Sequence, residues 1–275
     1  MRIDAHQHFW QFNPQRDRWI TDDMAVIRND YMPEDLQPLL QENGFDGCIA
    51  IEAAPSEAQT DFLVALASQF SYIKGVVGWV DLQVDTISSR LEHFSQYKII
   101  KGFRHALQGE PRRNLMLSPA FIRGMAALEA FNFTYDLLIF PDQLIYSKYL
   151  AARFPEQKFV IDHLAKPFIR KGEIKEWTLD MEAIAKLPNV WCKLSGMVTE
   201  ANWKTWRKED LRPYINVVVE SFGIDRILFG SDWPVCQLAA SYGEVVEIVR
   251  DYFSAFSPGE QQKVFGGNAT NFYSL

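Results

Sequence analysis

Residues 2–8 read RIDAHQH, a short apolar run that ends in two histidines. Seven further runs of this kind follow, and most segments between them repeat their apolar residues at helical spacing. The eight runs are RIDAHQH (2–8), GCIAIEA (47–53), GVVGWVDL (75–82), IIKGFRHAL (99–107), FTYDLLIF (133–140), FVIDHLAKP (159–167), VWCKLSG (190–196) and RILFGSDWP (226–234). Eight strands that alternate with helices fit either a closed barrel or an open doubly wound sheet.

The polar residues of these runs favour the barrel. They gather where the runs end, at His6, His8, Glu52, Trp79, Arg104, His105, His163, Lys193 and Asp232. In a barrel all these ends lie on one face, where barrel active sites are built. No G-x-G-x-x-G turn follows the first run, so an open dinucleotide-binding sheet has less support. The sequence therefore predicts an α/β protein, a single-domain (β/α)8 TIM barrel over residues 1–275.

Local signals mark the helices and one unusual loop. Ser56 with Gln59 forms a capping box before a helical run, and Ser118 followed by Pro119 marks the start of another. Residues 9–32, after the first strand, are too long for an ordinary connection in a barrel. Loops of this length are usually lids or binding loops, so we expect its aromatic residues to lie over the mouth of the barrel.

The composition excludes several classes of protein. The formal charge of −7 over 275 residues leaves no basic stripe for nucleic acid. No apolar run approaches the roughly 20 residues that a membrane helix needs, so no membrane partner is expected. The cysteines are three and widely spaced, at Cys48, Cys192 and Cys236. That pattern suits a reducing cytoplasm better than a disulfide framework.

Three histidines and one aspartate are the strongest candidates for chemistry. His6 and His8 are two positions apart, so in a strand both rings project into one space, where they can bind one divalent metal. His163 ends a strongly apolar run, and Asp232 ends the last one. Across the closed seam of a barrel Asp232 would lie beside the two histidines. The structural alternatives are a buried His163 bonded to a carbonyl group and an Asp232 that caps a turn.

Other polar residues have less certain places. Arg104 and His105 are neighbours on one strand, so only one points into the barrel, and we expect the other to reach the site from the rim. Lys193 needs a partner or a polar cavity if it is buried. His93 falls on the solvent face of a predicted helix. The sequence has neither the G-x-S-x-G elbow of serine hydrolases nor the H-E-x-x-H pattern of zinc proteases.

At DAHQHFW, DHLAKP, KLSG and GSDWP the chain resembles the amidohydrolase superfamily, in particular its lactonase branch. That branch includes fuconolactonases, rhamnonolactonases and, more distantly, 2-pyrone-4,6-dicarboxylate lactonases. The resemblance extends from the first strand to the terminal GGNATNFYSL, and it is greatest to the sugar-lactone hydrolases. It implies a hydrolase of carbohydrate metabolism that acts on a carboxylic ester.

The resemblance also implies roles for the four candidates. His6 and His8 match the paired metal-binding histidines, His163 matches the histidine of a later strand, and Asp232 matches the general base. The run FTYDLLIF has no histidine and no lysine placed to bridge two metals, so we expect one divalent metal, zinc foremost, held by His6, His8, His163 and Asp232. Catalysis without a metal stays open, because the pyrone-dicarboxylate lactonase of this branch needs none.

The expected reaction is hydrolysis of a sugar lactone similar to L-fuconolactone, with Asp232 and His163 as catalytic residues. Without a metal, His163 and Arg104 or His105 would polarise the carbonyl. Substrate contacts are expected from Arg104, His105, Trp10, Glu52 and Trp79. The strand ends supply only Arg104, Lys166 and Lys193 as cations, which favours a neutral sugar lactone. The alternatives are a rhamnonolactone or carboxylated lactone, a sugar-acid binder without turnover, and a decarboxylase-like lyase.

Overall fold

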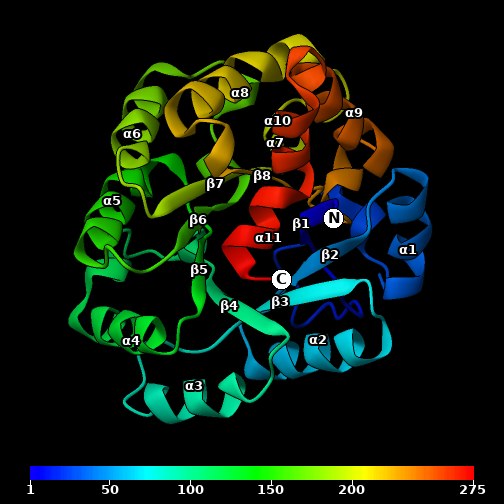
Figure 1. Ribbon diagram of the computed structural model, residues 1–275. Helices are drawn as coiled ribbons and strands as arrows, with labels where there is room; N and C mark the ends of the chain where they lie inside the picture. Colours follow the sequence, from blue (N-terminus) through cyan, green and yellow to red (C-terminus); the bar gives the residue numbers. More distant parts are fainter.

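The eight apolar runs form eight parallel strands in the computed structural model, which describes residues 1–275 (Figure 1). Each strand pairs with the next one along the chain. The strands are β1 (Ile3–Gln7), β2 (Gly47–Ile51), β3 (Ile73–Gly78), β4 (Ile100–His105), β5 (Thr134–Leu137), β6 (Phe159–Ile161), β7 (Val190–Leu194) and β8 (Ile227–Phe229). The predicted (β/α)8 barrel is confirmed.

The barrel closes between β1 and the segment that follows β8. The amide of Asp232 donates to the carbonyl of His6 at 2.8 Å, and the amide of His8 donates to the carbonyl of Trp233 at 2.7 Å. The amide of Ser231 donates to Oδ1 of Asp4 at 2.9 Å. The seam of the barrel therefore places Asp232 beside the two histidines of the first strand.

Helices surround the strands in Figure 1. They are α1 (Pro33–Glu42), α2 (Glu57–Gln69), α3 (Ile87–Ser95), α4 (Pro119–Ala130), α5 (Leu144–Arg153), α6 (Lys175–Ala185), α7 (Met197–Glu200), α8 (Lys208–Phe222), α9 (Tyr242–Tyr252), α10 (Pro258–Gln262) and α11 (Asn268–Tyr273). The predicted N-caps are confirmed, because Ser56 accepts from the amide of Gln59 and Ser118 from the amide of Phe121. The second half of the predicted capping box is absent, since the side chain of Gln59 donates to the carbonyl of Phe9 at 3.1 Å. None of these helices combines the length and apolar character that crossing a membrane requires.

His93 on α3 differs from the expectation that it faces solvent. It is half-buried, because its ring packs against Phe94 and Tyr97, with centroids 5.1 and 5.9 Å away. It still lies off the buried stripe of Leu91 and Phe94.

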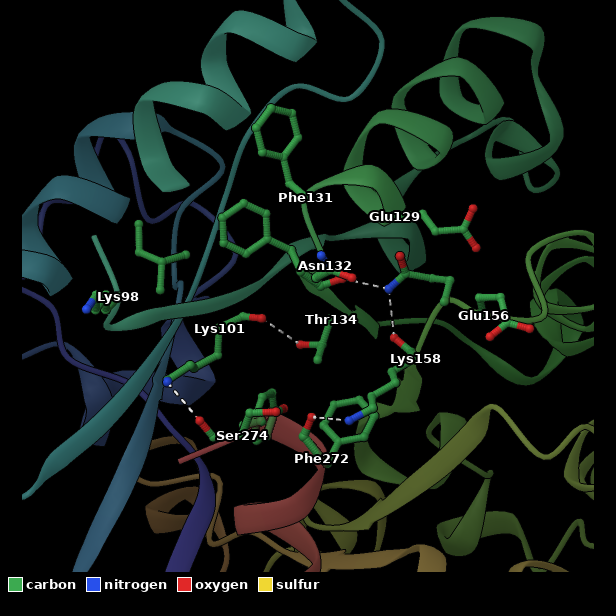
Figure 2. Close-up of a pocket in the computed structure, with 14 residues that line it drawn as sticks. Lys98, Lys101, Glu129, Phe131, Asn132, Thr134, Glu156, Lys158, Phe272 and Ser274 are labelled. Carbon is green, nitrogen blue, oxygen red and sulfur yellow. Dashed lines mark hydrogen bonds between the residues drawn. The ribbon is translucent and has the colours of Figure 1, made fainter. Parts of the chain in front are cut away.

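The last helix covers the amino-terminal end of the barrel. In Figure 1, α11 lies inside the ring of strands. Figure 2 shows how lysines from two strand starts hold it: Nζ of Lys101 donates to the carbonyl of Ser274 at 3.1 Å, and Nζ of Lys158 donates to that of Phe272 at 3.4 Å. Nζ of Lys158 also donates to the carbonyl of Asn271 at 3.3 Å. The barrel is therefore closed at this end and open at the other.

The long loop 9–32 builds a small core of its own. Trp10, Ile20 and Ile27 are buried together, and partly buried side chains from the loop and from the segments after β2 and β8 pack against them. Trp19 is 42% exposed, and its ring meets that of Trp10 at 5.9 Å between centroids.

Candidate active site

A cavity of about 400 Å³ opens at the carboxyl ends of the strands. Polar side chains from five strand ends line it, namely His8, Glu52, Arg104, His163 and Asp232. Trp19 and Met24 of the long loop contribute to its rim. The predicted site residues that belong to different strands therefore meet in one space.

The three histidines surround one carboxylate oxygen of Asp232. Oδ1 of Asp232 lies 3.5 Å from Nε2 of His8, and 3.8 Å from Nε2 of both His6 and His163. The Nε2 atoms of His6 and His8 are 3.3 Å apart. The four residues that the sequence singled out converge on a single point.

A hydrogen bond defines which nitrogen of the His8 ring carries the proton, whereas the His6 ring has a donor group beside each of its nitrogens. Nδ1 of His8 lies 2.9 Å from the carbonyl oxygen of Ile51, which only accepts, so Nδ1 is protonated and Nε2 has the lone pair. Arg104 can only donate, and its Nη1 lies 3.4 Å from Nε2 of His6. If His6 accepts there, its proton is on Nδ1, which lies 3.2 Å from Oδ1 of Asp162; if Nδ1 instead accepts from Nζ of Lys193, 3.3 Å away, the proton is on Nε2.

When Nε2 of His6 and Nε2 of His8 both carry lone pairs, they and the carboxylate of Asp232 repel one another unless a cation or a proton lies between them. Imidazole nitrogens bound to zinc at about 2.0–2.1 Å with a tetrahedral angle stand about 3.3–3.4 Å apart. The separation of His6 and His8 matches this value. With Asp232 they form a group whose ligand atoms lie within 4.8 Å of one another, and this donor set fits one divalent ion.

In a second group, made of His6, Asp162 and His163, the ligand atoms also lie within 4.8 Å of one another. Its carboxylate is already engaged, because Asp162 pairs with Arg104 at 3.0 Å and with Lys193 at 2.9 Å. These cations compete with a metal for its oxygens. The first group is therefore the better candidate metal site.

The protonation states also suit a cation. Burial lowers the pKa of His6 and of His163 well below the usual histidine value, so both rings are neutral at neutral pH. Burial acts to raise the pKa of Asp232, but its contacts with His163 and His8 favour the carboxylate more strongly, and this pKa lies below its usual value. Metal binding requires neutral imidazoles and an ionised carboxylate.

Two glycines of the sequence motifs make room for the rings. A Cβ atom on Gly196 would lie 2.6 Å from Nδ1 of His163, and one on Gly230 would lie 2.5 Å from Cβ of His6. The backbones of His163 and Asp232 are themselves left-handed, with φ of 52° and 58°. Strained conformations of this kind persist where the surrounding structure enforces them, commonly at active sites.

Beneath the cavity lies a buried ionic network. Arg104 donates from Nε to Glu52 at 2.9 Å and from Nη1 to Asp162 at 3.0 Å. Lys193 meets Asp136 at 2.5 Å and Asp162 at 2.9 Å, which supplies the partner that its burial was predicted to need. Sequence reasoning missed Asp136 and Asp162, although an acid inside an apolar run is itself a signal of a buried partner.

The five residues expected to contact substrate separate into two groups. Glu52 and Arg104 line the cavity. Trp10, Trp79 and His105 lie outside its lining. Because side chains alternate along β4, His105 points away from the lumen, where Nε2 meets Glu110 at 2.8 Å and the ring packs beside Trp79. Trp10 is buried in the core of the long loop and donates to the carbonyl of Asn29 at 2.9 Å.

Known proteins resemble this chain over its whole length. The amidohydrolase family model matches residues 3–275. An L-fucono-1,5-lactonase from Burkholderia multivorans is 38% identical over 286 residues, covering 100% of this chain and 96% of that protein. A crystal structure of an amidohydrolase from the same species with bound zinc has a TM-score of 0.96 at 37% identity, covering 100% of this chain and 99% of that one. An L-rhamnono-gamma-lactonase from Scheffersomyces stipitis is 25% identical over 209 residues, covering 66% of this chain and 61% of that protein.

The space beside His163 yields a prediction. Gly196→Ala is expected to displace the ring and weaken the affinity for Zn²⁺ at least about tenfold, as changes beside a ligand typically do. The matched control is Gly172→Ala, which carries the same left-handed strain at φ of 67° but meets no atom within 4 Å. Both variants should lose stability, and only the first should lose affinity in a competition with a chromophoric chelator. Equal affinities would show that Gly196 does not hold His163 in place as a metal ligand.

Proposed function

The chain belongs to the amidohydrolase family, and we propose that it hydrolyses a sugar lactone similar to L-fucono-1,5-lactone to the open aldonic acid. The observation that carries the proposal is the convergence of His6, His8, His163 and Asp232 at the floor of a sugar-sized cavity. The full-length similarity to an L-fucono-1,5-lactonase supports the choice of substrate.

Both apolar and polar side chains line the cavity. Segments after β8, β1 and β2 supply a continuous apolar surface made of Met24, Ala53, Val235 and Leu238. Segments after β4, β6 and β7, on the other side of the barrel, supply Gln108, Lys166 and Glu200. This side also contributes the apolar residues Ala106, Leu138 and Trp203. The buried Oε1 of Gln108 has no partner in the protein. A sugar ring that carries both hydroxyl groups and a methyl substituent suits a cavity with both kinds of side chain.

The cations near the cavity are already paired. Arg104 is held by Glu52 and Asp162, and Nζ of Lys166 lies 3.6 Å from Glu200. A carboxylated lactone needs unpaired cations to replace the water that it loses on binding. This pairing supports a neutral sugar lactone over a dicarboxylate.

The proposed reaction uses Asp232 as the base. A water molecule beside Oδ1 of Asp232 attacks the lactone carbonyl, and Asp232 takes its proton. When the tetrahedral intermediate collapses, Asp232 returns the proton to the ring oxygen that leaves. One divalent cation, zinc foremost, held by His6, His8, His163 and Asp232 would supply Lewis acidity to the carbonyl and to the water.

The protein also offers a donor of its own. The hydroxyl of Ser195 lies 2.9 Å from Nδ1 of His163 and can donate to it or accept from it. When Ser195 donates, Nε2 of His163 carries the proton and can donate to the developing oxyanion. Arg104 is committed to its two acids, so His163 is the donor that we assign to a reaction without metal.

We also propose a cytoplasmic location. Cys48, Cys192 and Cys236 are buried free thiols, none of them in a disulfide. A reducing compartment keeps such thiols in this state.

The first test is a panel of lactones assayed with a pH indicator. L-Fucono-1,5-lactone is expected to release one proton per molecule hydrolysed, faster than L-rhamnono-γ-lactone and 2-pyrone-4,6-dicarboxylate. Binding without proton release would favour the sugar-acid binder, and release of carbon dioxide from a carboxylated substrate would favour the lyase. Either outcome would reject the lactonase.

The second test is Asp232→Asn, which keeps the shape of the side chain and removes the base. General acid–base catalysis typically contributes about 100- to 10,000-fold, so kcat should fall at least about 100-fold with the fold intact. His93→Ala on α3 serves as the control and should retain nearly full activity. Near-normal turnover by Asp232→Asn would show that Asp232 is not the base.

The third test concerns the metal. The further carboxylate beside the four donors, that of Asp162, is already paired with Arg104 and Lys193. Elemental analysis of protein purified without chelators should therefore give about one equivalent of zinc or manganese per chain, or much less. Two equivalents, both needed for activity, would contradict a mononuclear site. If a chelator removes all metal and the rate is unchanged, Asp232 and His163 must carry the reaction.

A further inference from the structure

A chain of buried contacts leads from the last helix to the catalytic histidines. The hydroxyl of Tyr273 on α11 donates to Oδ2 of Asp136 at 2.9 Å. The same oxygen accepts from Nζ of Lys193 at 2.5 Å. That ammonium lies 2.9 Å from Oδ1 of Asp162, which in turn lies 3.2 Å from Nδ1 of His6. Every residue of this chain is at most 2% exposed.

Tyr273 is held firmly at the lower end of this chain. Lys101 and Lys158 bind the carbonyl groups on either side of it, as Figure 2 shows. Its ring lies 4.8 Å from that of Phe272, and Nζ of Lys193 stands 5.7 Å above it. The tyrosine therefore contacts both members of the Asp136–Lys193 pair.

Asp136 depends on this tyrosine to an unusual degree. Its side chain has two hydrogen-bond donors, Tyr273 and Lys193, and both serve Oδ2. Oδ1 has no partner. If the hydroxyl of Tyr273 is removed, Lys193 is the one donor left to a buried carboxylate, and the ammonium is drawn toward Asp136 and away from Asp162.

The position of Lys193 matters for the ring of His6. Nζ lies 3.3 Å from Nδ1 of His6, the atom that also lies 3.2 Å from Oδ1 of Asp162. If the ammonium of Lys193 moves away from Asp162, less of the carboxylate charge beside the His6 ring is neutralised. The ring then reorients, and with it the direction in which Nε2 faces the cavity. Tyr273 touches neither the cavity nor any of the four residues at its floor.

We propose that Tyr273 is a positioning residue of the active site, which fixes Lys193 through Asp136 so that Asp162 holds His6 in its working orientation. The proposal rests on the proposed lactonase function. It assigns a task in catalysis to the last helix, at the end of the barrel opposite the cavity.

The experiment compares Tyr273→Phe with Asp136→Asn and with the double variant. Changes to residues that orient a ligand typically cost about 10- to 100-fold, so Asp136→Asn should lower kcat by that amount, and the more remote Tyr273→Phe by about 3- to 10-fold. KM should stay within about twofold of the wild-type value in each case, because the walls of the cavity are untouched. In the double variant, Tyr273→Phe should add no further loss, since both changes act on one contact.

The matched control is Tyr135→Phe. Tyr135 is the neighbour of Asp136 on β5, but its buried ring packs outside the barrel against Phe121 and Phe159. This variant loses the same hydroxyl group and should keep wild-type kcat. Thermal unfolding of all variants establishes that each is folded.

Two results would overturn the proposal. One is a kcat for Tyr273→Phe that equals those of the wild type and Tyr135→Phe. The other is an equal loss from Tyr273→Phe in the presence and absence of Asp136→Asn, which would exclude the route through Asp136. If Tyr273→Phe fails to fold, Asp136→Asn decides alone, and an unchanged kcat for it rejects the proposal.

A failure of the lactonase function itself is recognised separately, because the wild-type protein then releases no proton from any lactone. In that case the same variants are compared by their affinity for Zn²⁺ in competition with a chromophoric chelator. Tyr273→Phe should bind several-fold more weakly than Tyr135→Phe, and equal affinities would overturn the positioning role.

Discussion

The Asp162 carboxylate joins three strands at the centre of the barrel. One oxygen lies 3.2 Å from His6 on β1 and 2.9 Å from Lys193 on β7, and the other accepts from Arg104 on β4 at 3.0 Å. All four groups are buried, and buried charges are tolerated only when they are paired. Removing one partner of such a set typically costs about 3–5 kcal/mol, because it leaves an uncompensated charge. The orientation of His6 toward the cavity therefore depends on ion pairs rather than on apolar packing.

This arrangement divides the barrel into two levels. Barrels of this class usually fill their interior with layers of branched apolar side chains. Here a cluster of ten apolar residues, with contributions from α11, occupies part of the interior, while the ionic network lies under the cavity. The backbone at the cavity is strained as well, since residues 163–166 and Asp232 all have φ between 52° and 58°. The large cluster of 63 buried residues, which includes side chains of the surrounding helices, supplies apolar stabilisation. This stabilisation offsets the cost of the buried charges and of the strained backbone.

Periodicity in the sequence was sufficient for the strands, because parallel strands buried on both faces read as apolar runs. The spacing of His6 and His8 and the position of Asp232 also predicted their convergence, since strand ends meet on one face. An acid inside an apolar run indicates that Asp136 has a buried partner, but not which one. Its contact with Tyr273 had no positional signal, because one residue lies inside a strand and the other near the end of the chain. Which of two adjacent residues enters the lumen, as for Arg104 and His105, depends on the register of β4, and a run of sequence does not specify register. Trp10 illustrates a third limit, since an aromatic residue in a long loop can line the cavity or build the core of the loop.

The same network bears on how the site works with or without a metal. Nδ1 of His6 has two neighbours, Oδ1 of Asp162 at 3.2 Å and Nζ of Lys193 at 3.3 Å. When Nδ1 donates to Asp162, Nε2 keeps its lone pair and is free to bind a metal. When Nδ1 instead accepts from Lys193, Nε2 carries the proton and becomes a donor toward the cavity. His8 has no such choice, because the carbonyl of Ile51 accepts from its Nδ1 and leaves Nε2 with the lone pair. His6 is therefore the histidine of this pair whose role can change between ligand and donor, and the distance of Lys193 from its ring determines which role is favoured.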